Sequence, residues 1–342
     1  HGQALAQRSV EYGFIGLGHK LAAARLDGDL VAHRFPFVLG YNAGVQKILI
    51  VGSGDVARRI LCQLPRACRV YALVRDVAAA AAWRAAGAWP ILGDLDQPAS
   101  LRRLAGLADI VLHLAPPPAH GERDSRTRHL LASLSRAASL PRRLIYVSTT
   151  GVYGDCGGAW IDETRPGAAH SARARRRVDA ETTLRAWGRR QGVTVCILRA
   201  PGIYAAERLP LARLQQGTPA LLAAEDVYSN HIHADDLAAA CCAAMRHGRP
   251  GRVYNVVDDS CLKMADYFDR VAAACHLPAP PRLSRQQLQE VLTPLQLSFM
   301  RESRRIRNDR LKTELHLRLR HPTVDSVLAG IAATLTRRNG CS

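Results

Sequence analysis

The stretch ILIVGSGDVARRI, residues 48–60, joins an apolar run to a helix-like segment through two glycines. Every residue from Ile48 to Val51 is β-branched or aliphatic, which is typical of a strand covered on both faces of a sheet. The residues after the glycines, DVARRILCQL, have the pattern of a helix. The stretch therefore predicts a strand, a tight turn and a helix, the order that opens a β–α–β unit.

The turn has the spacing of a dinucleotide-binding loop, Gly52-x-Gly54-x-x-Ala57. The first glycine permits the tight turn, the second lets the backbone approach a pyrophosphate, and the small third residue lets helix and strand pack closely. The N-terminus of the helix attracts the negative charge. We therefore expect a dinucleotide here, and the alternative is a turn of the same shape that binds nothing.

Strand-like and helix-like segments alternate from Lys47 to about residue 200. Expected strands cover residues 47–51, 69–74, 90–92, 109–115, 143–148 and 193–200, and expected helices cover 55–64, 76–87, 98–107, 125–138 and 172–190. This alternation predicts a parallel sheet covered on both faces, with right-handed connections. The expected fold class is α/β: a Rossmann-type doubly wound parallel sheet with a smaller C-terminal substrate-binding region.

The domain division follows from the same pattern. Residues 1–46 have weak periodicity and several glycines, so we interpret them as an N-terminal extension, in part disordered. Residues 47–200 form the expected NAD(P)-binding domain. Residues 201–342 form the expected C-terminal substrate-binding region, interleaved with the last strands of the sheet. Within it, residues 297–315 have the pattern of a basic amphipathic helix.

The ends of the second and third strands bear on the choice of cofactor. Arg75 follows the second strand and precedes Asp76, and an arginine there can bind a ribose 2′-phosphate. We therefore favour NADP over NAD, with a solvated loop arginine as the alternative. After the third strand, Asp94 is placed to accept a hydrogen bond from adenine and Leu95 to pack on the ring. A helix N-cap is the alternative role for Asp94.

Composition argues against several other classes of protein. The net charge is +18 and the pI about 10.2, which suggests polyanion binding. However, only four lysines occur among the 47 basic residues, and skewed arginine use is often a genome-composition effect. Aromatic residues make up 5% of the chain and do not interleave with basic stretches, as a stacking platform would need. Nucleic acid is therefore the least favoured partner.

Other sequence patterns bear on membrane association, metal binding and cellular location. No apolar run approaches the length of roughly 18 residues that spans a bilayer, and we recognise no signal peptide. The nine cysteines are scattered and never spaced C-x-x-C, which favours reduced thiols in the cytoplasm. No His/Cys cluster has the spacing of metal ligands, and His231 and His233 come nearest to it, so we expect no metal site. A homodimer is one assembly that the chain allows.

The chain resembles the extended and atypical short-chain dehydrogenase/reductases, the superfamily that contains NAD-dependent epimerase/dehydratases. The resemblance extends from Lys47 to about residue 335. It rests on the stretches VGSGDVA, GDLDQ, VLHLAPPP, IYVSTTGVYGD, CILRAPGIY, HIHADDLAAA and GRVYNVVDD. It implies a NAD(P) site and a small-molecule substrate. It also implies a hydroxyl residue, a tyrosine and a lysine in Y-x-x-x-K, which orient the substrate oxygen, exchange its proton and hold the nicotinamide ribose.

The Y-x-x-x-K motif is missing. With Glu181 matched to the family's glutamate, Arg173 occupies the tyrosine position and Arg177 the lysine position. No lysine occurs between Lys47 and Lys263, and no tyrosine between Tyr153 and Tyr204, so the motif cannot be recovered by shifting the alignment. Arginine stays protonated, which makes Arg173 a poor general acid. Arg177 can still hold a ribose or phosphate as a fixed cation.

The resemblance assigns roles to individual residues. The candidate catalytic residues are Thr149, Tyr153 as a surrogate acid, Arg173 and Arg177. The candidate cofactor residues are Gly52, Ser53, Gly54, Asp55, Val56, Arg75, Asp94, Leu95, Leu114, Ala115, Pro116, Ser148, Pro201, Gly202 and Ile203. The candidate substrate residues are Thr150, Asn230 and His231. For His233, Asp235 and Asp236 we expect structural roles, namely capping the next helix and packing on the sheet. Arg175 and Arg176 are expected to be solvated, on another face of the helix from Arg173 and Arg177.

Three functions remain open. The first is an NADP-dependent oxidoreductase, epimerase or dehydratase with a non-standard active site, acting on a small, anionic or sugar-derived substrate. The second is a catalytically degenerate NADP-binding sensor or regulator, which the loss of tyrosine and lysine favours. The third and least favoured is nucleic-acid binding through the basic segments.

Overall fold

The computed structural model describes residues 45–339, so the expected extension over residues 1–46 lies outside it except for its last two residues. A seven-stranded sheet has the order β12-β7-β5-β4-β1-β2-β3, and all its strand pairs are parallel. Its strands are β1 (Lys47–Val51), β2 (Arg69–Val74), β3 (Trp89–Leu92), β4 (Ile110–His113), β5 (Arg143–Thr149), β7 (Thr194–Ala200) and β12 (Val253–Asn255). The predicted α/β class is confirmed.

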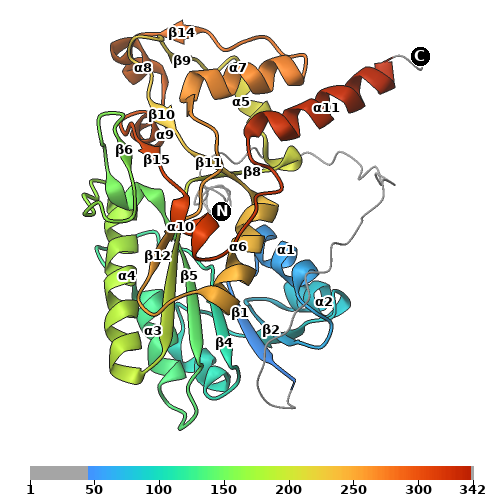
Figure 1. Cartoon of the computed structure of the whole chain (residues 1–342), viewed down its shortest axis with the longest axis vertical. Helices are drawn as coiled ribbons and strands as arrows, with labels where there is room; N and C mark the ends of the chain where they lie inside the picture. The colour runs from blue at the N-terminus through green and yellow to red at the C-terminus, as the bar shows by residue number, and fades with distance from the viewer. Residues whose placement is uncertain (1–44, 340–342) are drawn as a thin grey trace, which may run out of the picture.

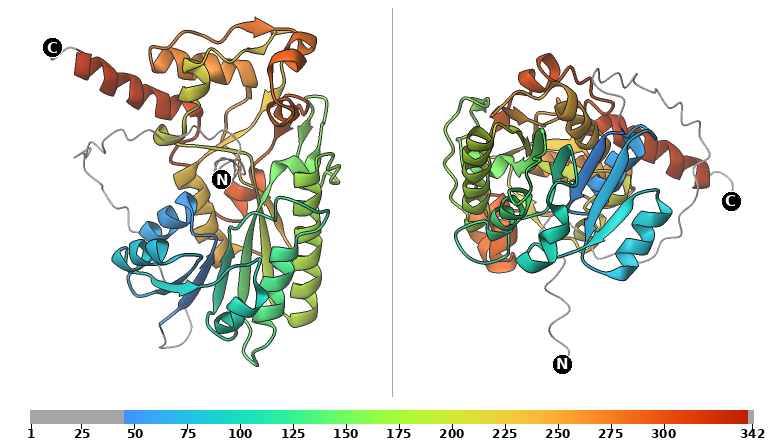
Figure 2. Two further views of the ribbon diagram at one scale, coloured as in Figure 1. Left: turned by 180° about the vertical axis from the view of Figure 1, so that it is seen from behind. Right: turned by 90° about the horizontal axis from the view of Figure 1, so that it is seen from below.

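Helices cover both faces of this sheet (Figures 1 and 2). Ile48 and Ile50 of β1 face one core cluster and Leu49 and Val51 the other, because successive residues of a strand point to opposite faces. The first cluster includes residues of α1 (Asp55–Gln63), α2 (Val77–Ala85) and α6 (Ala234–His247). The second includes residues of η1 (Pro98–Leu104), α3 (Ser125–Leu134) and α4 (Ala172–Gln191).

Local signals in the sequence set the ends of α4. The hydroxyl of Ser171 accepts the backbone N–H of Ala174 and caps the N-terminus. Gly192 ends the helix with φ +67°, the left-handed conformation that glycine adopts most easily. The helix thus begins at Ala172, one residue before Arg173, and carries both arginines of interest in its first two turns.

The C-terminal region forms a layer above the carboxyl ends of the strands (Figure 1). It has its own core, in which Tyr204, Phe268 and Leu288 are buried. Its helical segments are η3 (Ala206–Arg208), α5 (Leu211–Gln215), α7 (Met264–Ala274), α8 (Arg285–Val291), α9 (Pro294–Phe299), α10 (Asp309–Thr313) and α11 (Val324–Asn339). Short strand pairs complete it: β8 (Gly202–Tyr204) with β11 (His231–His233), β9 (Ala220–Leu221) with β14 (Arg282–Leu283), and β10 (Tyr228–Ser229) with β13 (Leu262–Lys263).

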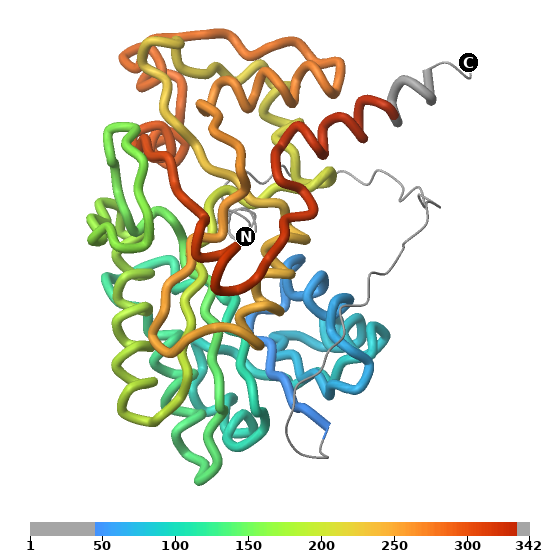
Figure 3. The backbone as a smooth tube through the Cα atoms, in the orientation of Figure 1, coloured from blue at the N-terminus to red at the C-terminus, as the bar shows by residue number. Residues whose placement is uncertain are grey.

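The single helix expected over residues 297–315 is wrong. The segment ends α9, forms β15 (Arg305–Ile306) and then forms α10. β15 pairs with β6 (Trp160–Ile161), and the amide side chain of Asn230 bonds the carbonyl of Arg304 and the N–H of Ile306. These long-range bonds outweigh helix propensity. Figure 3 shows residues 301–323 descending from the C-terminal layer toward the sheet and returning to α11.

Candidate functional site

The glycine turn lies where the strand order reverses, between β1 and β4. The carbonyl of Val51 accepts the N–H groups of Leu114 (2.7 Å) and Ala115 (3.1 Å), which brings the ends of both strands together. Gly52 has φ +101°, and a Cβ on it would lie 2.4 Å from the backbone nitrogen of Ala115. Only glycine fits there. Such a reversal forms a crevice at the carboxyl ends of the strands, where α/β proteins bind ligands.

The rest of the turn leaves room for an anion. A Cβ on Gly54 would meet no atom within 4 Å, so the backbone at the N-terminus of α1 is open. Ala57 is buried against β1, as expected for the small third residue. Open backbone N–H groups at a helix N-terminus, framed by two glycines, fit the pyrophosphate of a dinucleotide.

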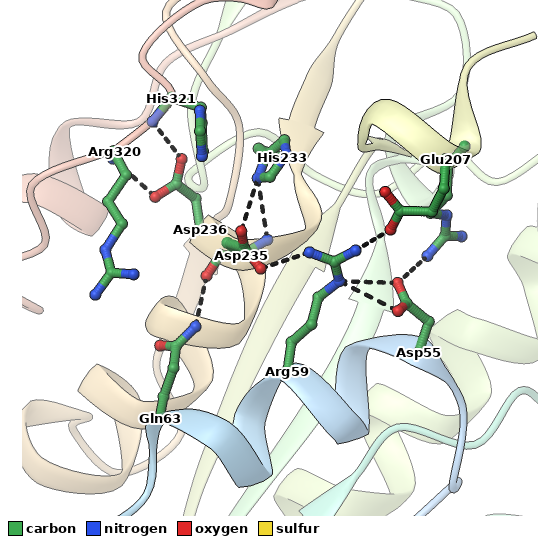
Figure 4. A network of polar contacts seen from close by, with 10 residues as sticks. Asp55, Arg59, Gln63, Glu207, His233, Asp235, Asp236, Arg320 and His321 are labelled. Carbon is green, nitrogen blue, oxygen red and sulfur yellow. Dashed lines mark hydrogen bonds and ion pairs between the residues drawn. The ribbon is translucent and has the colours of Figure 1, made fainter. Parts of the chain in front are cut away.

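An arginine-centred network compensates the acidic residue at this turn (Figure 4). The Asp55 carboxylate lies 3.1 Å from Arg59 Nε and 3.1 Å from Arg208 Nη1. Arg59 also bonds Asp235 at 2.5 Å and forms an ion pair with Glu207. The network ties α1 to η3 and α6, and sequence analysis missed it because these residues are distant in the chain.

The two residues after β2 differ in their contacts. Arg75 is exposed at the end of the strand. The Asp76 carboxylate accepts the N–H of Ala79 at 2.7 Å and caps α2. Asp76 is thus engaged in helix capping, while Arg75 is exposed, and its contact with a 2′-phosphate stays a prediction.

The helix-cap interpretation of Asp94 is wrong. The N-cap of η1 is Gln97, and the Asp94 carboxylate instead accepts the N–H of Asp96 at 2.9 Å within a turn. Leu95 is buried in the core, and its carbonyl contacts His129 Nδ1 at 2.7 Å. The adenine contacts proposed for Asp94 and Leu95 stay predictions.

A chain of buried polar contacts lies below the end of β5. Ser148 donates to Glu181 at 2.6 Å, and Glu181 forms an ion pair with Arg199 at 2.7 Å. The Arg199 guanidinium lies 4.6 Å from the centre of the Tyr153 ring, and the Tyr153 hydroxyl donates to Asn255 at 2.7 Å. Burial raises the pKa of Tyr153, and Arg199 opposes the rise. The candidate acid is therefore enclosed and hydrogen-bonded, and its catalytic role stays a prediction.

Thr149 stands at the carboxyl end of β5 and is half-buried. Its hydroxyl oxygen accepts the N–H of Gly151 at 3.2 Å and caps η2 (Thr150–Tyr153). A Cβ on Gly151 would lie 3.9 Å from the Cβ of Ala174, so this turn packs against the start of α4. Thr150 is buried. Of the neighbouring hydroxyls, Thr149 is thus the most accessible to a ligand in the crevice.

Arg177, at the lysine position, is buried against β5. Its Nη1 donates to the Tyr146 hydroxyl at 2.9 Å and to the Val147 carbonyl at 2.8 Å. Burial raises the pKa of Tyr146, and Arg177 opposes the rise. His113 packs against Tyr146 with ring centres 5.0 Å apart. Burial lowers the pKa of His113 to about 4. The Arg177 cation is thus in contact with buried, uncharged aromatic side chains.

Arg173, at the tyrosine position, is half-buried under the C-terminal layer. Its guanidinium lies 4.6 Å from the centre of the Phe299 ring at the end of α9. Burial lowers the pKa of Arg173, and Glu302 opposes the fall. The arginine remains a cation at neutral pH and cannot deliver a proton as tyrosine does.

The other two arginines of this helix differ from one another. Arg175 is exposed, as predicted, and forms an ion pair with Glu122 at 3.1 Å. Arg176 is buried and donates to the carbonyl of Gly121 at 2.8 Å, so the prediction that it is solvated is wrong. Both arginines therefore bind the loop before α3, Arg175 through the Glu122 carboxylate and Arg176 through the Gly121 carbonyl.

The remaining predicted cofactor residues lie at the carboxyl ends of the strands. Pro116 is half-buried, and its carbonyl accepts Arg126 Nη1 at 3.1 Å. Gly202 is exposed, between half-buried Pro201 and Ile203. Ser53 and Val56 are half-buried in the turn.

The predicted substrate residues are mostly engaged within the protein. Both ends of the Asn230 amide bond the backbone of β15 and its neighbour, at 3.0 Å to Arg304 and 3.1 Å to Ile306. His231 is buried and stacks on Tyr267 with ring centres 4.3 Å apart. Burial lowers the pKa of His231 to about 4, so this imidazole is neutral.

Asn230 nevertheless lines a cavity of about 240 Å³. Its walls include Trp160 and Tyr228, and the Arg305 guanidinium lies 5.2 Å and 4.7 Å from the centres of these rings. Asp258 also lines the cavity, and burial raises its pKa to about 7. Arg307, Asp259 and Asp309 also line the cavity, so groups of both charges face it and suit a polar ligand.

Of the three residues that we expected to cap α6 and pack on the sheet, only His233 caps the helix, and the Asp235 carboxylate bonds Arg59. His233 Nδ1 accepts the N–H of Asp235 at 3.2 Å and caps α6. Burial lowers the pKa of His233 to about 4, and His321 acts in the same direction. Asp236 does not cap α6; it accepts the N–H groups of Arg320 and His321 at 2.8 Å and 2.9 Å. It therefore anchors the segment before α11.

Two further observations concern the described residues as a whole. The cysteines described are all free thiols. Among residues 45–339, no helix combines the length and the apolar character needed to cross a bilayer.

The fold and crevice define a dinucleotide-binding α/β protein. Residues 48–257, well over half of the chain, match the NAD dependent epimerase/dehydratase family. The chain therefore belongs to that family, which confirms the resemblance found in the motifs.

Relatives with known structures agree. A functionally unknown conserved protein from Silicibacter pomeroyi DSS is 30% identical, with a TM-score of 0.69, over 85% of this chain and 99% of that one. UDP-glucose 4-epimerase from Thermotoga maritima, solved with UDP-glucose, is 16% identical, with a TM-score of 0.68, over 86% and 99%. dTDP-glucose 4,6-dehydratase from Bacillus anthracis, solved with NAD, is 16% identical, with a TM-score of 0.67, over 84% and 96%. At 16% identity, the comparison with these two enzymes shows a shared fold and nothing more.

The human dTDP-D-glucose 4,6-dehydratase is 25% identical over 136 residues, 37% of this chain. The matched segment spans 39% of the human enzyme.

Proposed function

We propose that the chain binds NADP in the crevice between β1 and β4 and catalyses a hydride-transfer step on a small, anionic or sugar-derived substrate. The glycine cradle at Gly52 and Gly54 is the observation that carries this proposal. Residues 47–200 form the NADP-binding domain and residues 201–342 the substrate-binding region. A cytoplasmic location and a homodimer complete the proposal, and the free thiols are compatible with that location.

The preference for NADP over NAD rests on Arg75. Its exposed guanidinium follows β2, where the adenine ribose lies in this fold, and Asp76 is engaged in capping α2. A guanidinium binds a phosphate through charge-assisted hydrogen bonds that a ribose hydroxyl cannot match. Asp55 does not repel the pyrophosphate strongly, because Arg59 and Arg208 compensate its charge.

The proposed chemistry uses fixed cations in place of a proton donor. Bound NADP supplies the hydride donor or acceptor. Arg177 holds the nicotinamide ribose, and Thr149 orients the substrate oxygen. Arg173 would stabilise negative charge that develops on this oxygen. Water then delivers the proton, because an arginine does not release one.

The substrate class rests on the polar lining of the C-terminal cavity, which includes two arginines, Arg305 and Arg307, and three aspartates, Asp258, Asp259 and Asp309. Arg305 lies between Trp160 and Tyr228, and Asp258 is neutral in part at physiological pH. This mixed lining favours a polar ligand with several hydroxyl groups, such as a sugar derivative.

The second candidate function is an NADP-binding sensor or regulator without catalysis. The enclosure of Tyr153 favours it, because the hydroxyl of that residue is bonded to Asn255 inside the protein. Under this alternative Thr149, Arg173 and Arg177 bind NADP without turning it over. The two candidates share the cofactor site and differ in whether NADPH is consumed.

A titration with NADPH and NADH, followed by nicotinamide fluorescence, tests the cofactor proposal. We expect NADPH to bind about 10- to 100-fold more tightly, the range of one or two charge-assisted hydrogen bonds. Arg75→Ala should reduce the affinity for NADPH to that for NADH. Arg84→Ala removes an exposed arginine from the adjacent α2 and should change neither affinity. Equal affinities in the unaltered chain would refute the role of Arg75.

A further inference from the structure

Two histidines and an aspartate meet at the N-terminus of α6. His233, Asp235 and His321 each place one possible ligand atom within 4.8 Å of the other two. His233 Nδ1 lies 3.7 Å from Asp235 Oδ2, and the rings of His233 and His321 have centres 3.8 Å apart. Figure 4 shows the three side chains gathered around one space. Sequence spacing did not reveal the cluster, because His321 comes from a distant segment.

The ligand atoms of this cluster differ in their present partners. Asp235 Oδ1 bonds Arg59, whereas Oδ2 has no hydrogen bond among the described residues. His233 Nδ1 accepts the backbone N–H of Asp235 at 3.2 Å, so it is unprotonated, and an ion that binds this nitrogen replaces that hydrogen bond. The Asp235 side chain is 34% exposed, which leaves the cluster open to an ion and to water.

A neighbouring carboxylate positions the third ligand. Asp236 accepts the backbone N–H groups of Arg320 and His321, which fixes the segment beside His233. Asp236 bonds the backbone and not the imidazole of His321, so it acts on the position of the segment and not on the orientation of the ring. The placement of His321 therefore does not depend on a mobile side chain alone.

The charges around the cluster also favour a cation. The adjoining network joins three carboxylates, Asp55, Glu207 and Asp235, to two guanidiniums, Arg59 and Arg208. Its formal charge is therefore −1, and a divalent cation would be compensated in part. Arg59 occupies one oxygen of Asp235 and leaves the other for the ion.

We propose that His233, Asp235 and His321 bind one divalent transition-metal ion, with Zn²⁺ the preferred ion. Two imidazole nitrogens and one carboxylate oxygen form a donor set that suits Zn²⁺ and is poorly matched to Mg²⁺ or Ca²⁺, which take oxygen ligands. Water completes the coordination. The ion joins the cap of α6 to the segment before α11 and so fastens the C-terminal region to the sheet beside the cofactor turn.

Calorimetric titration of the full chain with Zn²⁺, after treatment with EDTA, tests the proposal. We expect one equivalent of Zn²⁺ to bind, Mg²⁺ not to compete, and the melting temperature to rise with Zn²⁺. His321→Ala should weaken Zn²⁺ binding by about 100-fold or more, and Asp236→Asn by roughly 10- to 100-fold. His247→Ala is the matched control: it removes a ring from a second histidine pair, centres 5.1 Å apart, and should have no effect.

Two results would overturn the site. One is the absence of stoichiometric Zn²⁺ binding to the unaltered chain, which needs no variant. The other is equal weakening by His247→Ala and His321→Ala, which would indicate surface histidines in general. Circular dichroism and NADPH affinity verify that each variant folds.

Discussion

The two ends of the crevice in this chain differ in how far they keep the motifs of the family. At the β1–α1 turn, Gly52, Gly54 and Ala57 keep the spacing and packing of a dinucleotide loop. At the start of α4, Arg173 and Arg177 stand where the resemblance places tyrosine and lysine. The first end is built from backbone, whereas the second depends on side-chain chemistry.

The difference shows what the fold itself supplies. A pyrophosphate needs backbone N–H groups and the absence of Cβ atoms, and any sequence with glycines in place provides both. Proton exchange needs a particular side chain with a suitable pKa, and arginine lacks it. A chain can therefore lose the standard chemistry at α4 and still keep the cofactor turn intact.

The largest expected effect is at the turn. Gly52→Ala places a Cβ 2.4 Å from the Ala115 nitrogen at a φ of +101°, so it should destabilise the fold and abolish NADPH binding. Gly54→Ala meets no protein atom, so the melting temperature should stay unchanged while NADPH affinity falls about tenfold or more. Thermal melts and NADPH titrations separate the two. A stable Gly52→Ala variant would mean that the turn is not as tight as described.

The second largest effect should follow from breaking the buried ion pair between Glu181 of α4 and Arg199 of β7. Glu181→Gln leaves the Arg199 guanidinium buried without a counter-charge, which should cost about 3–5 kcal/mol of unfolding free energy. Arg175→Ala breaks the exposed pair with Glu122 and should cost less than about 1 kcal/mol. Urea unfolding of both variants gives the comparison. Similar costs for the two would show that Glu181 and Arg199 are not a buried pair.

A smaller effect should appear with pH. His113 has a folded pKa of about 4, below the unfolded value of about 6.5, so the unfolded chain binds the proton first as pH falls. The contribution of His113 to the free energy of unfolding is fully present above about pH 6.5 and is lost between about pH 6.5 and 4. We expect this loss to amount to about 2 kcal/mol between pH 7 and 5.

The variant His113→Gln isolates this contribution. His113 Nε2 lies 2.9 Å from Thr127 Oγ1, and a glutamine amide is expected to make the same contact without titrating. Urea midpoints at pH 7 and 5 should differ less in the variant than in the unaltered chain. An identical pH dependence in the two proteins would show that His113 is not the titrating group.

The parts of this molecule that were predictable from sequence are those that local pattern determines. Apolar runs such as Ile48–Val51 gave the strands, and the glycine spacing gave the turn, because both signals lie within a few residues. The broken segment at Arg305–Ile306 was not predictable, since its shape depends on Asn230 and on β6.

The candidate site follows the same division. Gly52 and Thr149 stand at strand ends, where the motif places them. The burial of Arg176 and the enclosure of Tyr153 depend on loops and strands that come together only in the folded chain. The meeting of His233 with His321 is of the same kind.

The measurement that tests the account most directly is a crystal structure of the chain with NADP bound. We predict the 2′-phosphate on Arg75, the pyrophosphate at the N-terminus of α1, and the Arg177 guanidinium within hydrogen-bond distance of the nicotinamide ribose. A dinucleotide bound outside the β1–β4 crevice, or a nicotinamide ribose out of reach of Arg177, would contradict the account.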